Sequence, residues 1–454
     1  MRRLRIDEAA AALYLPALYH LGRRPYPRLV SELVASERFD PEQLHQLQLA
    51  RLRALVTHCY ANVPYYRALF NDLDVRPDDI RSMEDYARLP LLEKDTLRAE
   101  FASFIATDSH GERLMAATTS GSSGSPLKYR YDPEYFLHGW SALIRNMTWT
   151  GFRLGERQAW FTFSAAGGAK RALRLTLERK WLARELTFSD ETLDGWARRL
   201  AHWEPRFVYG TPSSRLAPLA AHLLAHNVKP QGIRAVMSSS ETLVDEQRQL
   251  IEEAFGAKVF NQYGATECLS IASECEAGSM HVNAELNLVE FERTEWTGDA
   301  RAVIVTPLLN YGVPLLRYVL RDLGGSLPGQ CPCGRTLPRM RNLIGRTSCC
   351  ATLSDGSFVT PFAFEELVES TPGIVRFQFR QVKPDSFDLL VVTLPGAADS
   401  VRHALADLDA QFERNNGRKA HFALRLVDDI PFTPGGKHLY VIPLTDSAST
   451  SHRA

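Results

Sequence analysis

The sequence predicts an α/β protein: a large N-terminal domain with sheets covered by helices, followed by a small mobile α+β domain. Helical apolar spacing dominates the first 100 residues, and helix-like and short strand-like segments alternate from about residue 134. The pattern changes again near Gly345-Arg346. We therefore expect domains at 1–345 and 346–445, and a flexible polar tail at 446–454.

The N-terminal hundred residues are expected to be mostly helical. Asp40-Pro41 provides a cap and a first-turn proline. Apolar residues then recur at helical spacing, at Leu44, Leu47, Leu49, Leu52, Leu55 and Val56. The apolar stretch 9–18 is shorter than the roughly 18 residues that a membrane span requires, so we expect an amphipathic helix packed on the body.

Later elements follow the same reasoning. Expected helices lie at 197–202, 214–226, 245–255, 361–370 and 401–413. Expected strands lie at 235–237, 258–260, 286–291, 302–308, 374–382, 387–394 and 422–427. The composition permits a substantial core, because 45% of the 454 residues are hydrophobic.

Charge and cysteine content exclude several classes of protein. The chain has 53 basic and 53 acidic residues, so no net field draws it to nucleic acid or an anionic membrane. Seven cysteines are too few for a disulfide scaffold, and their odd number favours a reducing compartment. We expect a cytoplasmic monomer or homodimer with no membrane span and no nucleic-acid partner.

Two segments carry the chemistry of a phosphate site. The loop 118–128 is rich in hydroxyl residues and glycine, so it can surround a polyphosphate, although a Gly/Ser linker has the same composition. The predicted strand 258–260 is followed by 261–267, a glycine turn at the position where open α/β sheets bind ligands. An ordinary strand-to-helix turn remains the alternative for this second segment.

A third set of residues suggests a metal. Cys331-Pro332-Cys333 places two thiols on one turn, and Cys275 and His281 precede it by about 50 residues. Three cysteines and one histidine are a tetrahedral zinc complement, although reduced side chains near a turn would look the same in the sequence.

These segments together resemble the adenylate-forming (AMP-forming) acyl ligases. The other motifs are Leu316 to Asp322, the Gly345-Arg346 junction and Pro434-Gly435-Gly436-Lys437. The match is closest to the phenylacetate–CoA ligase and CapK-like branch, which the run 58–67 also resembles. The resemblance covers residues 40 to 445 approximately, with the motifs in family order.

The resemblance implies a nucleotide site. The residues implied to bind the ATP β- and γ-phosphates are Thr118, Thr119, Ser120, Gly121, Ser122, Ser123, Gly124 and Lys128. Those implied to form the adenine pocket, with Tyr263 stacked on the base, are Ser239, Ser240, Glu241, Asn261, Gln262, Tyr263 and Gly264.

The resemblance also implies the reacting groups. Thr266 would bind the α-phosphate and Glu267 the Mg²⁺ ion. Asp322 would hold the ribose hydroxyls, Arg346 would contact the nucleotide, and Lys437 would reach in from the small domain during adenylation. The family's metal pattern implies a structural Zn²⁺ at Cys275, His281, Cys331 and Cys333.

The acid and the acceptor are less defined. Segments 160–168 and 209–213 align with the family's acyl pocket, and their aromatic residues suit an aryl or apolar acid. The basic stretch 170–184 could contact CoA, although a solvated helix face is the commoner explanation for such a stretch. Ser348 replaces the family's hinge aspartate, and Arg321 replaces a glycine before Asp322. These departures leave room for an acceptor other than CoA.

The sequence therefore predicts an enzyme that uses ATP to activate a carboxylic acid as an acyl-adenylate, with release of pyrophosphate. The acyl group would pass to CoA or to another thiol (such as a carrier protein), an amine or a hydroxyl. Two alternatives are an adenylyltransferase that leaves AMP on a hydroxyl acceptor and a non-catalytic nucleotide-binding pathway protein.

Overall fold

The computed structural model describes residues 26–118, 128–162, 169–183, 189–293, 301–343, 345–346, 351–355, 358–359, 363–364, 367–368, 371–431 and 438–444. The predicted helix at 9–18 and the tail at 446–454 lie outside these ranges, as does most of the predicted helix at 361–370. In the described part of the chain, every helix is too short or too polar to cross a membrane.

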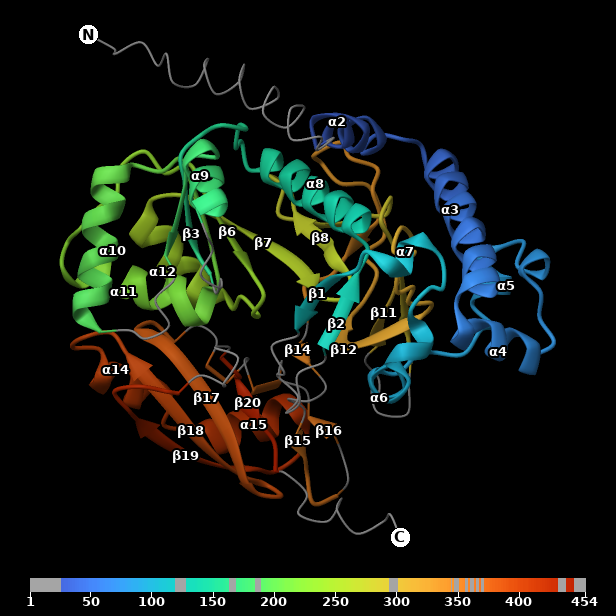
Figure 1. Cartoon of the computed structure of the whole chain (residues 1–454). Coiled ribbons are helices and arrows are strands. Elements are labelled where there is room, and N and C mark those ends of the chain that lie inside the picture. The colour runs from blue at the N-terminus through green and yellow to red at the C-terminus, as the bar shows by residue number, and fades with distance from the viewer. Residues whose placement is uncertain are drawn as a thin grey trace.

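The N-terminal segment is helical, as the apolar spacing predicts. Its helices are α2 (Tyr26–Ser36), α3 (Pro41–Asn62), α4 (Pro64–Asp72), α5 (Met83–Tyr86), α6 (Lys94–Ala99) and α7 (Ser109–Glu112), with 3₁₀ turns at Pro77–Asp79 and Phe101–Phe104. Asp40 caps α3, because its carboxylate accepts the backbone N–H of Gln43. Helices α3 to α5 lie along one side of the molecule (Figure 1).

An eight-stranded sheet forms the centre of the N-terminal lobe, which we define as residues 26–346. Its strands are β3 (Gln158–Phe161), β4 (Lys180–Ala183), β5 (Phe207–Gly210), β6 (Ala235–Ser239), β7 (Lys258–Ala265), β8 (Leu269–Glu274), β9 (Met280–Val282) and β13 (Arg339–Met340). Their order is β13-β9-β8-β7-β6-β5-β3-β4, parallel from β4 to β7 and antiparallel from β7 to β13. The predicted fold class is thus confirmed as mixed α/β.

Helices cover this sheet, and two smaller sheets adjoin it. The helices are α8 (Pro133–Trp149), α9 (Ala169–Leu177), α10 (Asp190–Trp203), α11 (Ala217–Ala225), which follows a π-helical turn at Pro212–Leu216, and α12 (Asp245–Phe255). The smaller sheets comprise the hairpin β1 (Met115–Thr118) and β2 (Lys128–Tyr131), and the antiparallel strands β10 (Asn287–Glu292), β11 (Arg301–Pro307), β12 (Tyr318–Gly324) and β14 (Gly345–Arg346).

Residues 351–444 form the C-terminal lobe, which lies below α10 to α12 in Figure 1. Its elements are β15 (Ala351–Thr352), β16 (Phe358–Val359), β17 (Ile374–Lys383), β18 (Ser386–Thr393), α14 (Ala398–Ala404), α15 (Leu408–Asn416), β19 (His421–Leu426) and β20 (Val441–Ile442). The prediction of one helix at 401–413 is wrong, because the chain bends at 405–407 between α14 and α15. The bend lets Leu405 and Leu408 both enter the core of this lobe.

Candidate active site

The predicted adenine-pocket segments lie side by side at one edge of the large sheet. Strands β6 and β7 are parallel, with Ser239 opposite Gln262 in the register, and the Ser239 hydroxyl donates to the side-chain oxygen of Gln262. Residues 240–241 follow the carboxyl end of β6, where open α/β sheets bind ligands.

The segment predicted as a glycine turn is a continuation of β7. The expectation that the strand ends at 260 is wrong, because residues 262–265 also pair with β8. Gly264 is required for this pairing. A Cβ atom at that position would lie 2.3 Å from the carbonyl oxygen of Leu269. Thr266 and Glu267 therefore occupy a strand-to-strand turn and not a helix start.

Tyr263 and Asp322 join the two main sheets of the N-terminal lobe. The Tyr263 hydroxyl donates to Oδ2 of Asp322 over 2.7 Å, and the two residues are only 7% and 2% exposed. The sequence predicts that Tyr263 stacks on the base and that Asp322 holds the ribose. The structure adds a direct bond between these two residues, which fixes the orientation of the carboxylate.

The backbone around Asp322 keeps a conformation that favours glycine. Arg321 has a φ of +59°, and its guanidinium lies 3.2 Å from Glu93. Arg321 therefore takes the left-handed conformation that glycine adopts most readily. Asp322 also pairs with Arg346 across β12 and β14, so the backbone of Arg346 lies beside the predicted ribose site.

Glu267, the predicted magnesium ligand, contacts a lysine that the sequence analysis missed. The Lys94 ammonium lies 3.4 Å from Oε1 of Glu267, and the Tyr318 hydroxyl donates to the same oxygen over 3.1 Å. A parallel bridge between Leu92 and Tyr318 brings the start of α6 to this point. The single sequence offers no signal for Lys94, because the contact depends on this long-range bridge.

Glu241 connects the sheet edge to the C-terminal lobe. Its carboxylate accepts the backbone N–H groups of Ser213 and Ser214, both at 3.0 Å, and that of His438 at 3.3 Å. Glu241 was predicted in the adenine pocket, and Ser213 in the acyl pocket. The structure brings both to the boundary between the lobes. Lys437, the residue before His438, lies outside the described residues.

The predicted phosphate loop is described only at its two ends. Thr118 and Lys128 are paired across β1 and β2. The predicted phosphate ligands Thr119, Ser120, Gly121, Ser122, Ser123 and Gly124 lie outside the described residues, as does the hinge residue Ser348.

The four predicted zinc ligands come together. The potential ligand atoms of Cys275, His281, Cys331 and Cys333 all lie within 4.8 Å of one another. Sγ of Cys275 is 3.7 Å from Sγ of Cys331, and Sγ of Cys333 is 3.4 Å from Nε2 of His281. A tetrahedron with Zn–S bonds of about 2.3 Å has edges of roughly 3.8 Å, so these separations suit a metal.

The environment of His281 also suits metal binding. Burial lowers the pKa of His281 to about 4, so its imidazole stays neutral near pH 7. Nδ1 lies 3.1 Å from the carbonyl oxygen of Leu337. A proton on Nδ1 leaves the lone pair of Nε2 directed at the cysteines. Arg335, from the same loop, packs its guanidinium 4.6 Å from the Trp149 ring, which connects the cluster to α8.

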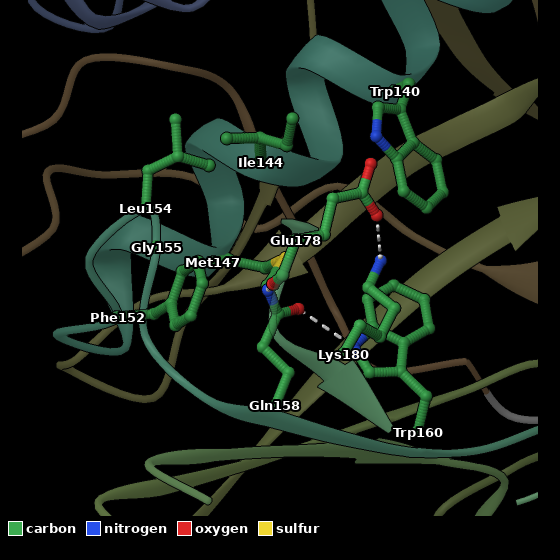
Figure 2. Close-up of a pocket in the computed structure, with 10 residues that line it drawn as sticks. All are labelled: Trp140, Ile144, Met147, Phe152, Leu154, Gly155, Gln158, Trp160, Glu178 and Lys180. Atoms are coloured by element: carbon green, nitrogen blue, oxygen red, sulfur yellow. Dashed lines mark hydrogen bonds and ion pairs between the residues drawn. The ribbon is translucent and has the colours of Figure 1, made fainter. Parts of the chain in front are cut away.

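Aromatic residues of the predicted acyl pocket line the face of the sheet below α8. Trp160 and Tyr209 stack with ring centroids 4.1 Å apart, and Trp160 also borders a cavity of about 20 Å³ (Figure 2). Lys180 in that cavity lies 3.4 Å from Glu178 and 3.9 Å from the Trp160 ring centroid. This cavity lies at the amino ends of β3 and β4, away from the candidate nucleotide site, and has room for about one water molecule.

Comparison with known proteins gives sequence relatives but no matching family model. The chain is 26% identical over 358 residues to phenylacetate-coenzyme A ligase of Thermus thermophilus, covering 75% of this chain and 78% of the relative. It is 22% identical over 415 residues to protein CapK of Staphylococcus aureus, covering 88% of this chain and 89% of CapK.

The fold is also similar to a solved ligase. The structure of 2-hydroxyisobutyryl-CoA ligase in the postadenylation state, in complex with R3-HIB-AMP, superposes with a TM-score of 0.73 at 20% identity. The superposition covers 90% of this chain and 91% of that protein. The two chains therefore share a fold over almost their whole length.

Proposed function

Because the chain belongs to the adenylate-forming acyl ligase superfamily, in its phenylacetate–CoA ligase and CapK-like branch, we propose that it is an AMP-forming carboxylate ligase. A carboxylate attacks the α-phosphate of ATP, pyrophosphate leaves, and an acyl-adenylate forms. CoA or another thiol, amine or hydroxyl acceptor then takes the acyl group and AMP is released.

The observation that carries this proposal is the bond between Tyr263 and Asp322. It links the carboxyl end of the parallel sheet to the neighbouring sheet at a buried carboxylate. An ionised carboxylate accepts several hydrogen bonds, so Asp322 can hold Tyr263 and two vicinal ribose hydroxyls together. In this role Tyr263 orients Asp322 and also contacts the base.

Glu267 is the residue that would hold magnesium. The residue is 4% exposed and its carboxylate already lies beside the Lys94 ammonium, so this position favours a cation. Bound Mg²⁺ would neutralise charge on the ATP phosphates. We propose that Lys94 offers its ammonium to the same phosphates, and that Thr266 donates its hydroxyl to the α-phosphate.

Domain closure would complete the site. We propose that the chain divides near 345–346 and that the C-terminal lobe acts as a lid carrying Lys437. This is supported by the core of that lobe, which Val244 of the N-terminal lobe also enters, and by the contact of His438 with Glu241. An ammonium at position 437 would stabilise the charge that develops between the carboxylate and the α-phosphate.

A structural zinc ion fits the four-residue cluster. Cys275, His281, Cys331 and Cys333 would all be ligands, which leaves no open position for catalysis. The bound ion would fix the loop that carries Arg335 against α8.

The test is acid-dependent ATP–pyrophosphate exchange with a panel of aryl, aliphatic and amino acids, with and without CoA. We expect exchange with at least one acid, and loss of this exchange in the Lys437→Ala variant. Tyr66→Phe is the control, because the buried hydroxyl that it removes is bonded to the backbone of Pro314 and Leu316 and to none of the proposed ligand residues.

Mass analysis of the products decides between the reactions. Free AMP and an acylated acceptor support the ligase. AMP that stays on the acceptor indicates an adenylyltransferase instead. Failure of the purified chain to bind ATP would leave a non-enzymatic role and overturn the proposal.

A further inference from the structure

The hydroxyl of Tyr440 makes a specific contact across the boundary between the lobes. Tyr440 lies just before β20 and is 6% exposed. Its oxygen is 2.5 Å from Oγ of Ser213, 2.9 Å from the carbonyl oxygen of Thr242 and 3.0 Å from Oε1 of Gln247. All three partners belong to the N-terminal lobe. The hydroxyl of Tyr440 therefore enters a polar socket on the N-terminal lobe, which we define as Ser213, Thr242 and Gln247.

The socket is built from elements that follow the parallel strands. Ser213 lies in the π-helical turn after β5, Thr242 follows β6, and Gln247 lies on α12. Ser213 and Gln247 are buried, and their side chains are 3.2 Å apart. These groups therefore converge at the same sheet edge as the candidate nucleotide site.

The hydroxyl groups of the socket form one consistent set of hydrogen bonds. Tyr440 donates to Thr242, and the Ser213 hydroxyl donates to Tyr440. Nε2 of Gln247 has no partner in one amide orientation. A half-turn of the amide, which interchanges N and O, brings Nε2 within donor distance of both hydroxyl oxygens. Loss of the Tyr440 hydroxyl would leave buried polar groups unpaired.

The ring of Tyr440 is anchored in its own lobe. Its centroid is 5.0 Å from that of Phe377 and 4.9 Å from that of His438. Val244, from the N-terminal lobe, packs into the same apolar cluster. Because the ring is held on one side and the hydroxyl on the other, rotation of the lobe must break these hydrogen bonds.

A second hydrogen bond lies two residues earlier in the chain. The backbone N–H of His438 donates to Glu241, which also accepts two N–H groups from the π-helical turn that carries Ser213. The segment 438–440 is thus attached at two points to one structural unit, which comprises the turn at 212–216 and the residues after β6.

We propose that Tyr440 is a positioning residue that holds the C-terminal lobe in the orientation required for acyl-adenylate formation. This inference rests on the proposed function and adds a role that Glu267, Asp322 and Lys437 do not fill. The contacts of Tyr440 are hydrogen bonds between uncharged groups, so the lobe can release them for the acyl-transfer step. The Tyr440 hydroxyl contacts the protein groups of Ser213, Thr242 and Gln247, and through them it sets the fraction of molecules with a closed site.

The experiment compares Tyr440→Phe with wild type in acid-dependent ATP–pyrophosphate exchange. We expect kcat to fall about tenfold, with the KM for ATP within about twofold of wild type, because the closed population falls while the nucleotide site on the N-terminal lobe remains. Tyr66→Phe, which also removes a buried tyrosine hydroxyl, controls for lost stability and should keep wild-type kcat.

A second variant tests the socket from the other side. Ser213→Ala should lower kcat by about threefold, and Tyr440→Phe combined with Ser213→Ala should be no worse than Tyr440→Phe alone, since both remove one shared contact. If Tyr440→Phe does not fold, Ser213→Ala alone decides. Additive losses, or no loss in a folded single variant, would overturn the proposal.

Hydrogen–deuterium exchange separates this proposal from the proposed function. In Tyr440→Phe, the amides of 213–214 and 438–440 should exchange faster, while those of β17 and β18 stay protected. If wild type shows no ATP–pyrophosphate exchange with any acid of the panel, the proposed ligase function is wrong. The exchange rates of these amides still show whether Tyr440 holds the two lobes together. Unchanged protection at 213–214 and 438–440 would refute the positioning role.

Discussion

The ammonium of Lys94 lies 3.4 Å from the carboxylate of Glu267, although the two residues are far apart in the chain. The Lys94 side chain is 23% exposed and that of Glu267 is 5% exposed, so the pair is largely shielded from solvent. Glu267 therefore has a cationic partner before any magnesium arrives.

Replacement of Lys94 by methionine should show how strongly the buried Glu267 carboxylate depends on a neighbouring cation. We expect the free energy of unfolding in EDTA to fall by about 1–3 kcal/mol, because a buried carboxylate loses its partner. Added Mg²⁺ should raise the thermal midpoint of Lys94→Met more than that of wild type. The control is Lys419→Met, which removes an exposed ion pair with Glu413. An equal response to Mg²⁺ in both variants would argue against a cation site at Glu267.

Tyr263→Phe should weaken ATP binding without abolishing it. The ring can still contact the base, but Asp322 loses the hydrogen bond that orients it. A hydrogen bond to a charged group contributes about 1.5–3 kcal/mol, so we expect the KM for ATP to rise roughly tenfold or more. Asp322→Ala should lose exchange almost completely. A KM for ATP that is unchanged in both variants would place the ribose elsewhere.

The positive φ of Arg321 predicts an unusual order of stabilities. Glycine relieves about 1–2 kcal/mol of left-handed strain, whereas the ion pair with Glu93 is exposed and contributes at most about 1 kcal/mol. Both Arg321→Gly and Arg321→Ala lose this ion pair, but only the alanine variant keeps the backbone strain. Arg321→Gly should therefore be at least as stable as Arg321→Ala. Urea denaturation measures both, and a clearly more stable alanine variant would contradict this reasoning.

Removal of the cysteine cluster should cost both metal and stability. Purified protein should contain nearly one zinc ion per chain, and Cys331→Ser with Cys333→Ser should lose it, with a lower thermal midpoint. Cys59→Ala is the control, because Cys59 is a buried core residue outside the cluster. Zinc-free wild-type protein of unchanged stability after chelation would show that the cysteines are simply reduced.

The buried imidazole of His438 predicts how stability depends on pH. Burial lowers the pKa of His438 to about 4, while its Nε2 lies 2.7 Å from the carbonyl oxygen of Phe377. Between pH 6.5 and 4 the unfolded chain binds a proton that the folded chain excludes. Stability therefore falls as pH decreases through this window, by up to about 1.4 kcal/mol per pH unit, and His438 has little effect above pH 7.5.

His438→Gln should flatten that part of the profile, because its amide can still donate to Phe377 but takes up no proton. The exposed residue His421 provides the matched comparison, His421→Gln. Urea unfolding at several pH values measures both, and parallel profiles for wild type and His438→Gln would refute the assignment.

Local patterns in the sequence predicted most elements but not the long-range contacts. Helix α12 begins and ends where the apolar spacing indicated, because its amphipathic period and its glycine stop are local signals. The four candidate metal ligands were predicted from their residue types and the family resemblance, and the structure brings their ligand atoms within 4.8 Å of one another. The roles of Lys94 and Tyr440 were not predicted, because each depends on a contact with a segment far away in the chain. Strand β7 extends through residue 265 because these residues pair with β8. Considered without that partner, the glycine-containing segment indicates a turn.

The pairing of β7 with β6 and β8, which has one register shift between Tyr263 and Gly264, limits how this site can change over evolution. Alternate residues of a strand face opposite sides, so inserting or deleting one residue ahead of Tyr263 would turn its ring away from Asp322. Point substitutions can therefore vary the side chains of this segment, whereas insertions or deletions would break the hydrogen bond between Tyr263 and Asp322. We expect natural variation in substrate to accumulate in the flanking loops, with the spacing from Asn261 to Ala265 kept constant.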